Sequence, residues 1–473
     1  MLNCGDDCSW DELNWKDIHY QVRKLQKRIA VATKAENWYK VRKLQKLVYN
    51  SRVCRLVAVQ RVTSRKNIRT PGIDGKFWSS DKDKYMAVSN MDYRYYKPRP
   101  FKRVYVPKDH DKSKKRPLSI PVIFDRAMQG LFLIAVDPVI ETLADRHSYG
   151  FRKCRSSQDA TKDIVDRFGF DKNNVWVLKT DVKECFDHLS HEWILDHAPM
   201  NKKLLKNILS CGYLHKGDFY PTFEGMPQGG VLSPVFTTLT LSGFENIINN
   251  KYSGSNVRMI RFVDDFLFSG DNKEILSCVL EDLILFLTGR GLELSKDKTC
   301  IIHITDGVDF IGWNFKRECN RIVVLPTDQS IQELQKRICD ILNQNINWTK
   351  KRLICKLNGI IRGWGGYHAY LCPMDVMIEL DNYLSELLWI WARNKYISHD
   401  SAWVYNHCWK YDEVSEVRVF SSGDYILLKF VDMKIRVSDV LDLSKNPYID
   451  HEYFQKRKKP TYQYEYLKIP MER

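Results

Sequence analysis

The amino-acid sequence predicts an α+β protein built from several domains. The chain has 473 residues, which is too long for one ordinary domain and long enough for three or four. Hydrophobic residues make up 44% and charged residues 28%, as is typical of a globular protein. Helical and strand-like patterns alternate up to about residue 320, residues 326–400 are mainly helical in pattern, and short strand patterns return afterwards.

The charge balance indicates a polyanionic partner. Lys and Arg number 74 against 58 acidic residues, so the formal net charge is +16. Nucleic acid is the commonest large polyanion, and an acidic membrane is the competing partner. No lipidation signal and no apolar run of the roughly 18 residues that a spanning helix needs is present, so we expect no membrane partner. Thirteen scattered cysteines favour reduced thiols in a cytosol-like compartment.

The first 60 residues contain a short repeat. Val22-Arg-Lys-Leu-Gln-Lys27 recurs as Val41-Arg-Lys-Leu-Gln-Lys46, with apolar residues three or four positions apart. This spacing predicts two helices, each with an apolar face and a basic face. We expect the basic faces to contact RNA, and an ordinary solvated surface is the alternative. The candidate RNA-binding residues are Arg23, Lys24, Arg42 and Lys43.

A basic hairpin follows further along the chain. Residues 103–107 alternate like a strand and residues 117–121 alternate like its partner. The loop from Lys108 to Arg116 between them is rich in cations. Such a loop could close over a triphosphate, or it could simply be a solvated tip.

Three carboxylates form the main candidate for a chemical site. Apolar residues flank Asp264-Asp265, which predicts a hairpin with these two residues at its tight turn. The strand-like run 176–180 leads directly into Asp181. Carboxylates at the end of one strand and at a neighbouring turn can meet at one edge of a sheet. They could then hold two Mg²⁺ ions about 3.5–4 Å apart for phosphoryl transfer to a 3′-hydroxyl.

These residues resemble the motifs of a known family. Asp181-x-x-x-x-Phe186 and Phe262-Val-Asp-Asp265 are similar to the two metal-binding motifs of reverse transcriptases, and Gly225-Met-Pro-Gln-Gly-Gly230 is similar to their P-Q-G motif. Nearly the whole chain resembles the reverse transcriptase/maturase encoded by group II introns, in its form without an endonuclease module. The other matching runs are Gly72-Ile-Asp-Gly75, Lys115-Arg-Pro-Leu-Ser-Ile-Pro121, Ser148-Tyr-Gly-Phe-Arg152, Phe310-Ile-Gly-Trp313, Arg362-Gly-Trp-Gly-Gly-Tyr-His368 and Asn446-Pro-Tyr448.

The resemblance implies a right-hand polymerase fold, with the fingers and palm of a reverse transcriptase, an N-terminal helical extension, a helical thumb and a small C-terminal domain. On this basis residues 1–92 are the RNA-binding N-terminal extension and residues 93–325 are the fingers and palm. Residues 326–400 are the thumb, called maturase domain X, and residues 401–473 are a region similar to the family's DNA-binding part.

The resemblance also implies roles for single residues. Asp181, Asp264 and Asp265 match the catalytic residues that hold two Mg²⁺ ions, and the backbone carbonyl of Val182 is a further expected ligand. The residues that match nucleotide-binding positions are Lys108 and Arg116 at the triphosphate, Phe186 beneath the sugar, and Gln228 and Gly229 near the templating base. One departure is Phe262-Val263, where the family usually has Tyr-Ala.

The implied function is RNA-directed DNA polymerisation combined with binding of intron RNA, assistance in its splicing, and copying of the intron into DNA during mobility. The expected partners are intron RNA, an RNA template and a DNA primer or target, in a ribonucleoprotein. A bacterial cytoplasm is the expected location, with an organelle matrix or stroma as the alternative. Two other functions stay open: a splicing factor with impaired polymerase, and a domesticated relative in repair or phage defence.

Overall fold

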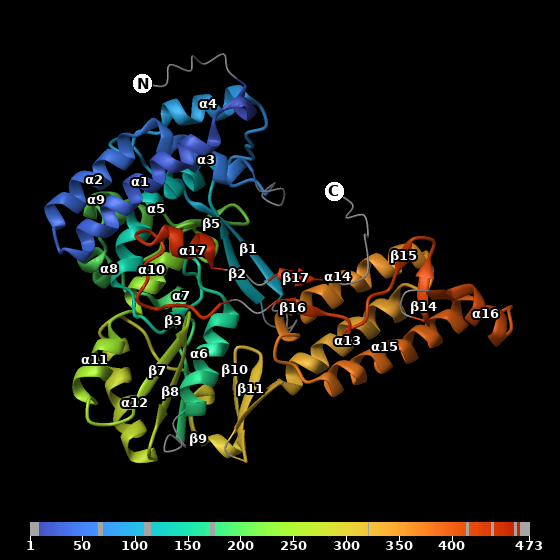
Figure 1. The fold of residues 1–473 in the computed structure, drawn as a ribbon. Helices are drawn as coiled ribbons and strands as arrows, with labels where there is room; N and C mark the ends of the chain where they lie inside the picture. The colour runs from blue at the N-terminus through green and yellow to red at the C-terminus, as the bar shows by residue number, and fades with distance from the viewer. Residues whose placement is uncertain are drawn as a thin grey trace. The chain divides into compact units, whose positions relative to one another are not determined.

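Figure 1 shows the chain as a computed structural model that describes residues 9–64, 70–107, 115–170, 176–319, 321–412, 416–436, 439–457 and 461–463. The chain divides into two compact units. The first comprises Met1–Arg167, Asp171–Ile302 and Leu441–Lys456, and the second comprises Phe168–Phe170, His303–Val440 and Arg457–Arg473. Each unit has its own hydrophobic core. The predicted α+β class is confirmed, since both units combine helices with sheets.

The helices of the first unit begin with the predicted amphipathic pair. In chain order they are α1 (Trp15–Lys34), α2 (Trp38–Asn50), α3 (Arg52–Thr63), α4 (Asp81–Asn90), α5 (Ile123–Leu143), α6 (Ser157–Phe170), α7 (Cys185–His188), α8 (His191–His197), α9 (Lys202–Leu209), α10 (Ser233–Thr240), α11 (Phe244–Lys251), α12 (Lys273–Thr288) and α17 (His451–Lys456). Most residues of α5 are buried, and α1, α2, α3 and α10 pack against it (Figure 1). A helix that is apolar nearly all round belongs in a core, so α5 organises this unit.

The repeat in α1 and α2 has a packing role on α5. Pro138 of α5 has no N–H, which in a regular helix would donate to the carbonyl of Ile134. The Gln26 side chain of α1 donates to that carbonyl at 3.1 Å instead. Gln45, at the same position of the repeat in α2, donates to the carbonyl of Ala135 at 3.3 Å. Both glutamines are buried, so the repeat satisfies two carbonyl groups beside the proline.

Two sheets complete the first unit. A five-stranded sheet has the order β3-β7-β8-β4-β9, and α11 and α12 pack against it (Figure 1). Its strands are β3 (Ser148–Tyr149), β7 (Arg258–Phe262), β8 (Asp265–Gly270), β4 (Trp176–Asp181) and β9 (Cys300–His303). A four-stranded sheet has the order β2-β1-β5-β6, with strands β1 (Phe101–Pro107), β2 (Lys115–Ile120), β5 (Tyr213–His215) and β6 (Asp218–Tyr220). The antiparallel β1–β2 pair confirms the predicted basic hairpin, although residues 108–114 lie outside the described residues.

A segment near the C-terminus belongs to the first unit. The Tyr448 hydroxyl donates to the carboxylate of Asp137 on α5, and the ammonium of Lys153 lies 4.3 Å from the centre of the Tyr448 ring. The Asn446 side chain donates to the Thr142 hydroxyl at 3.1 Å. The Asn446-Pro-Tyr448 run therefore packs on α5 close to Pro138.

The second unit combines long helices with two three-stranded antiparallel sheets, β10-β11-β12 and β13-β14-β15, and a two-stranded one, β16-β17. Its elements are β10 (Val308–Phe310), β11 (Trp313–Glu318), β12 (Arg321–Pro326), α13 (Asp328–Gln344), α14 (Lys350–His368), α15 (Met374–Lys395), α16 (Ser401–Cys408), β13 (Trp409–Asp412), β14 (Val417–Ser422), β15 (Tyr425–Ile426), β16 (Lys434–Arg436) and β17 (Thr461–Gln463). The mainly helical pattern predicted for residues 326–400 is confirmed. Within the part of the chain that the structure describes, none of the helices has the length and hydrophobicity needed to cross a bilayer.

One strand is shorter than its sequence pattern predicts. The pattern extends from Tyr425 to Phe430, but β15 ends at Ile426. Beyond that point, the N–H of Leu428 donates to the Asn358 side chain at 2.9 Å, and the N–H of Phe430 donates to the Asp381 carboxylate at 2.8 Å. Side chains of α14 and α15 therefore take backbone hydrogen bonds that a longer strand would have used.

Replacing Gln26 with Leu should lower the free energy of unfolding by about 1–3 kcal/mol, because the carbonyl of Ile134 would stay buried without its donor. Urea unfolding of parent and variant measures the difference. Gln21→Leu is the matched control, since Gln21 lies on the same helix and donates to Asp17 one turn away. Its change should stay below about 0.5 kcal/mol. Equal small effects of both substitutions would contradict the proposed role of Gln26.

Burial raises the pKa of Asp137 to about 6, against the opposing effect of its hydrogen bond from Tyr448. The folded protein therefore binds this proton more tightly than the unfolded chain does. The resulting stability is complete below about pH 4 and is lost as the pH rises through about 6. Asp137→Asn lacks this loss, so the variant should gain stability relative to the parent between pH 4 and 7. Urea midpoints that run parallel across this range would contradict the assignment.

Candidate active site

The three predicted carboxylates lie at the end of the β7–β8 hairpin and of β4. Strand β7 ends at Phe262 and β8 begins at Asp265, with Val263 and Asp264 in the turn. The predicted turn at Asp264-Asp265 was therefore wrong by one residue. The reason is that Phe262 pairs directly with Asp265, which fixes Asp265 as the first residue of the strand.

The register of β4 against β8 brings the carboxylates to one end of the sheet. The two strands are antiparallel, and Asp181 lies directly opposite Asp265. The N–H of Val182 faces the carbonyl of Asp264 at 3.4 Å. Val182 itself is buried, with 1% of its surface exposed. The structure therefore brings together all four residues that the sequence suggested for the metal site.

Burial and mutual repulsion of the carboxylates raise the pKa values of Asp264 and Asp265. Burial raises the pKa of Asp264, and the charge of Asp181 raises it further. The pKa of Asp265 is also raised, by burial first and then by Asp181 and Asp264. Clustered acids of this kind hold protons tightly unless a cation neutralises them. The site therefore has a shortage of positive charge.

Lys298, which the sequence patterns did not indicate, supplies part of the missing positive charge. The ammonium of Lys298 donates to Asp181 at 2.6 Å, and this hydrogen bond raises the pKa of Lys298. The N–H of Ser295 donates to the backbone carbonyl of Asp181 at 2.8 Å and holds the same segment against β4. Among the described residues, no three His, Cys, Asp or Glu side chains are arranged to hold a metal ion as they stand. Lys298 contacts Oδ2 of Asp181, so it competes with a cation for that oxygen.

The turn beside the carboxylates has a strained backbone. Val263 has φ +57°, a conformation that β-branched residues rarely adopt. Its N–H donates to the carbonyl of Tyr149 at 2.9 Å, and the buried Arg261 side chain donates to the carbonyl of Val263 at 2.9 Å. Gly150 leaves room for this turn, since a Cβ at Gly150 would lie 2.3 Å from the Val263 side chain. Contacts from β3 and β7 therefore hold the turn in place.

The P-Q-G loop packs against α7, the short helix that carries Phe186. The N–H of Met226 donates to the carbonyl of Phe186 at 2.6 Å, and the Gln228 side chain lies 3.5 Å from the Asp187 carboxylate. Phe186 is half-buried and contributes to the lining of a cavity of about 420 Å³. Its ring is inclined at 77° to that of Phe151, with the ring centres 6.3 Å apart.

The same loop is fixed to β2. The N–H of Ser119 donates to the carbonyl of Gln228 at 2.7 Å. Gly229 has φ +104°, and a Cβ there would lie 2.7 Å from the Ser119 carbonyl, so this position requires glycine. Arg116 is exposed on β2, three residues before Ser119. Lys108 lies outside the described residues.

Three of the four candidate RNA-binding residues are exposed on the N-terminal helices. Lys24 lies on α1, and Arg42 and Lys43 lie on α2; all three are exposed, while Arg23 on α1 is half-buried. The ammonium of Lys24 lies 5.5 Å from the centre of the exposed Tyr20 ring. Lys43 lies 4.4 Å from the similarly exposed Tyr39 ring. The structure does not bring these residues to the carboxylates; they form a separate surface that combines cations with aromatic rings.

Three family descriptions match consecutive parts of the chain. Residues 10–91 match the N-terminal domain of reverse transcriptase, and residues 106–315 match reverse transcriptase (RNA-dependent DNA polymerase). Residues 331–409 match the group II intron maturase-specific domain. The second match contains Asp181, Asp264 and Asp265, together with the P-Q-G loop.

Three relatives show how far the similarity extends. The chain is 27% identical to Protein YkfC of Escherichia coli, over 63% of this chain and 90% of that protein. It is 27% identical to the group II intron-encoded protein LtrA of Lactococcus lactis, over 55% of this chain and 54% of LtrA, so the match spans about half of that relative. It is 26% identical to maturase-like protein 1 of Euglena gracilis, over 75% of this chain and 76% of that protein.

These matches cover both units and follow the order of the motifs along the chain. They also agree with the geometry, because the family's two metal-binding motifs meet at the β4–β8 pair. The expected fingers and palm of a right-hand polymerase are confirmed. The chain carries a reverse transcriptase domain followed by the maturase-specific domain of group II introns, and it is similar to group II intron-encoded proteins.

Proposed function

We propose that this protein copies RNA into DNA at the site formed by Asp181, Asp264 and Asp265. We also propose that it binds group II intron RNA, assists its splicing and copies the intron during mobility. The observation that carries the proposal is the β4–β8 register, which sets Asp181 opposite Asp265 with Asp264 in the adjoining turn. Paired carboxylates at a sheet edge are what phosphoryl transfer to a 3′-hydroxyl needs.

The donor set suits two Mg²⁺ ions. Carboxylate and carbonyl oxygens are the ligands that Mg²⁺ prefers, and they would come from the three aspartates and the backbone of Val182. The raised pKa values of Asp264 and Asp265 support this fit, because burial and the neighbouring carboxylates outweigh the positive charge of Lys298. When bound, the ions would activate the primer hydroxyl and neutralise charge on the transferring phosphate. Lys298 would release Asp181 as the site is filled and keep its charge nearby.

Residues around the carboxylates would position the nucleotide. Phe186 would pack beneath the sugar, where a rigid ring excludes a 2′-hydroxyl. Gln228 and Gly229 would contact the templating base pair, since their loop is fixed between α7 and β2. Arg116, together with Lys108, would neutralise the triphosphate.

The N-terminal helices would bind the intron RNA. Their exposed cations can neutralise phosphates, and the neighbouring Tyr20 and Tyr39 rings can stack on unpaired bases. This surface is separate from the carboxylates, so binding of the intron and DNA synthesis can be tested independently. The partners would be intron RNA, an RNA template and a DNA primer or target. The working form would be a ribonucleoprotein in a bacterial cytoplasm or an organelle.

Replacing Asp264 with Asn should lower primer extension on an RNA template by a factor of about 100–1000 or more, while RNA affinity stays within about twofold. Loss of one ligand removes stabilisation of the transition state but leaves remote phosphate contacts unchanged. Asp306→Asn, which removes an exposed carboxylate elsewhere, is the control. Extension by Asp264→Asn at the parent's rate would exclude the metal-site assignment and favour a splicing factor that does not use these residues.

Changing Arg23, Lys24, Arg42 and Lys43 together to Gln should weaken binding of structured RNA and flatten its salt dependence. Each lost phosphate contact should reduce the slope of log K against log salt concentration by about 0.7–0.9. Filter binding over a range of salt concentrations measures both quantities. The control changes Lys202, Lys203 and Lys206 of α9, which are also exposed. An unchanged slope in the variant with all four N-terminal substitutions would show that these cations are ordinary solvated residues that do not bind RNA.

Replacing Gly150 with Ala should lower primer extension by about tenfold or more. The new methyl group would push against Val263 and shift the turn that carries Asp264, and displacements of about 1 Å at a catalytic group are costly. Gly217→Ala is the matched control, since Gly217 also has a positive φ but no atom within 4 Å of the added Cβ. Equal extension rates for the two variants, both folded, would show that the Gly150 contact does not position the site.

A further inference from the structure

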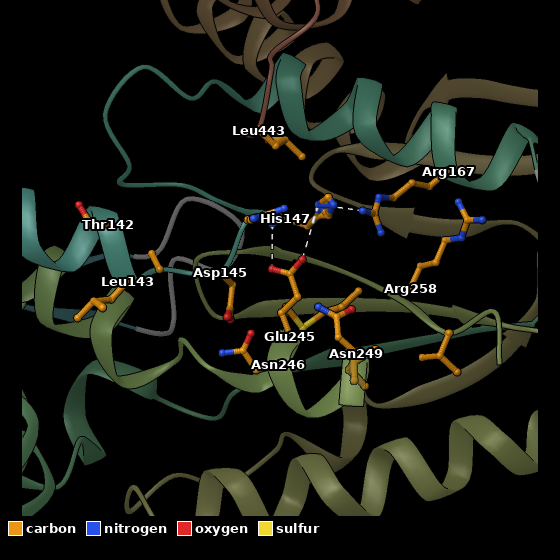
Figure 2. A pocket seen from close by; sticks show the side chains of 15 residues that line it. Thr142, Leu143, Asp145, His147, Arg167, Glu245, Asn246, Asn249, Arg258 and Leu443 are labelled. Carbon is orange, nitrogen blue, oxygen red and sulfur yellow. Dashed lines mark hydrogen bonds and ion pairs between the residues drawn. The ribbon is translucent and has the colours of Figure 1, made fainter. Parts of the chain in front are cut away.

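Figure 2 shows a polar cavity of about 580 Å³ in the first unit. Residues of the α5–β3 connection, α6, α11 and the start of β7 line it. Arg258 is the first residue of β7, and Asp264 lies in the turn that follows the last residue of that strand. The length of β7, at about 3.3 Å per residue, therefore separates the cavity from the candidate active site. A volume of this size is in the range of small-molecule sites.

Cationic side chains reach the cavity from three separate elements. They are Arg146 in the α5–β3 connection, Arg167 on α6 and Arg258 at the start of β7. Figure 2 shows Arg167 and Arg258 on the same side of the cavity. Guanidinium groups that converge from different elements suit the oxygens of a phosphate, which they bind through paired N–H groups.

Neighbouring contacts fix Arg167 and His147. Arg167 donates to the Asp163 carboxylate at 3.1 Å and to Nδ1 of His147 at 2.9 Å. Because a guanidinium only donates, Nδ1 of His147 accepts and the ring is neutral. Burial lowers the pKa of His147 to about 2, with the charge of Arg167 as a further cause. The histidine therefore adds no charge, and the cations of the cavity are its arginines.

Acceptors lie on the opposite part of the lining. Asp145 is 5% exposed, and its Oδ1 accepts from the N–H of Gly243 at 2.8 Å. Its Oδ2 has no hydrogen-bond partner among the described residues. Asn246 and Asn249 lie one turn apart on α11 and add amide groups (Figure 2). The Oδ2 atom of Asp145 is sealed from the cavity, so the acceptors that an N–H or O–H donor of a ligand can reach come from other lining side chains, such as the amides of the two asparagines.

The wall that carries Asp145 is rigid. The Arg152 side chain donates to the carbonyl of Asp145 at 2.5 Å and to the Ser148 hydroxyl at 2.6 Å. Its other N–H groups bind the Glu141 carboxylate at 2.7 and 2.9 Å. All these groups are buried, so the cavity wall is held in place before any ligand arrives.

We propose that this cavity binds a nucleoside phosphate, with the phosphate at the arginines and the N–H donors of the base at the asparagine amides of α11. The nucleotide is either free or an unpaired residue of RNA, since both offer the same groups. The site is distinct from the polymerase centre, because none of its lining residues belongs to the carboxylates, the P-Q-G loop or α7.

The test is a calorimetric titration of the full-length Asp264→Asn protein with GMP, without divalent cations, so that nucleotide binding at the polymerase centre does not contribute. GMP should bind with a Kd on the order of 100 µM, and inorganic phosphate at least about tenfold more weakly because it lacks the base. Arg146→Gln and Arg258→Gln should each weaken GMP about tenfold. Lys203→Gln, which removes a surface charge that does not line the cavity, should leave the affinity unchanged.

A single-stranded RNA oligonucleotide distinguishes the two sources. If it displaces GMP, the natural ligand is an RNA nucleotide, and if it does not, the ligand is free; both results support the site. No heat with millimolar GMP, or GMP affinity unchanged in both arginine variants, would overturn the proposal. Arg146 is exposed, so we expect the Arg146→Gln protein to fold, and its affinity for GMP can be measured even if Arg258→Gln fails to fold. The titration needs no polymerase activity, so its failure and that of the proposed function are distinguishable.

Discussion

The candidate active site depends on the antiparallel pairing of β4 with β8. This register sets Asp181 opposite Asp265, and the β7–β8 turn then places Asp264 beside both. A slip of one residue would move Asp181 to the other face of the sheet, because successive side chains of a strand alternate. The contacts of Val263 with Tyr149 and Arg261 hold the turn, so the register and the turn together define where the carboxylates meet.

Placing three carboxylates together has an electrostatic cost that the rest of the site offsets. The raised pKa values of Asp264 and Asp265 express that cost, and the ion pair of Lys298 with Asp181 relieves part of it. Arg261 is buried behind the turn and adds a fixed positive charge. Such a site keeps several carboxylates close together, so a divalent cation can bind between them. A metal-dependent polymerase requires a cluster of carboxylates of this kind.

Local sequence patterns predicted some of the elements and placed the three aspartates at strand ends, because these features depend on neighbouring residues. The helices of the repeat, the β1–β2 hairpin and the strand ending at Asp181 all follow from apolar spacing. Lys298 and Gly150 could not be found in this way, since their roles depend on pairing between distant strands and on a contact across the sheet. The roles of Gln26 and Gln45 were likewise hidden, because only the fold reveals which carbonyls lie beside Pro138. The turn was misplaced by one residue because the sequence pattern does not distinguish an aspartate in a turn from an aspartate that begins the following strand.

The most direct test of the central claim is to count divalent ions at the carboxylates. Electron paramagnetic resonance with Mn²⁺ as the probe would be recorded on the protein with an RNA template, a chain-terminated DNA primer and the matching deoxynucleotide. We expect two bound Mn²⁺ ions close enough to couple magnetically, and loss of that coupled pair when Asp265 is replaced by Asn. A coupled pair that persists in the Asp265→Asn protein, or no pair in the parent, would contradict this expectation.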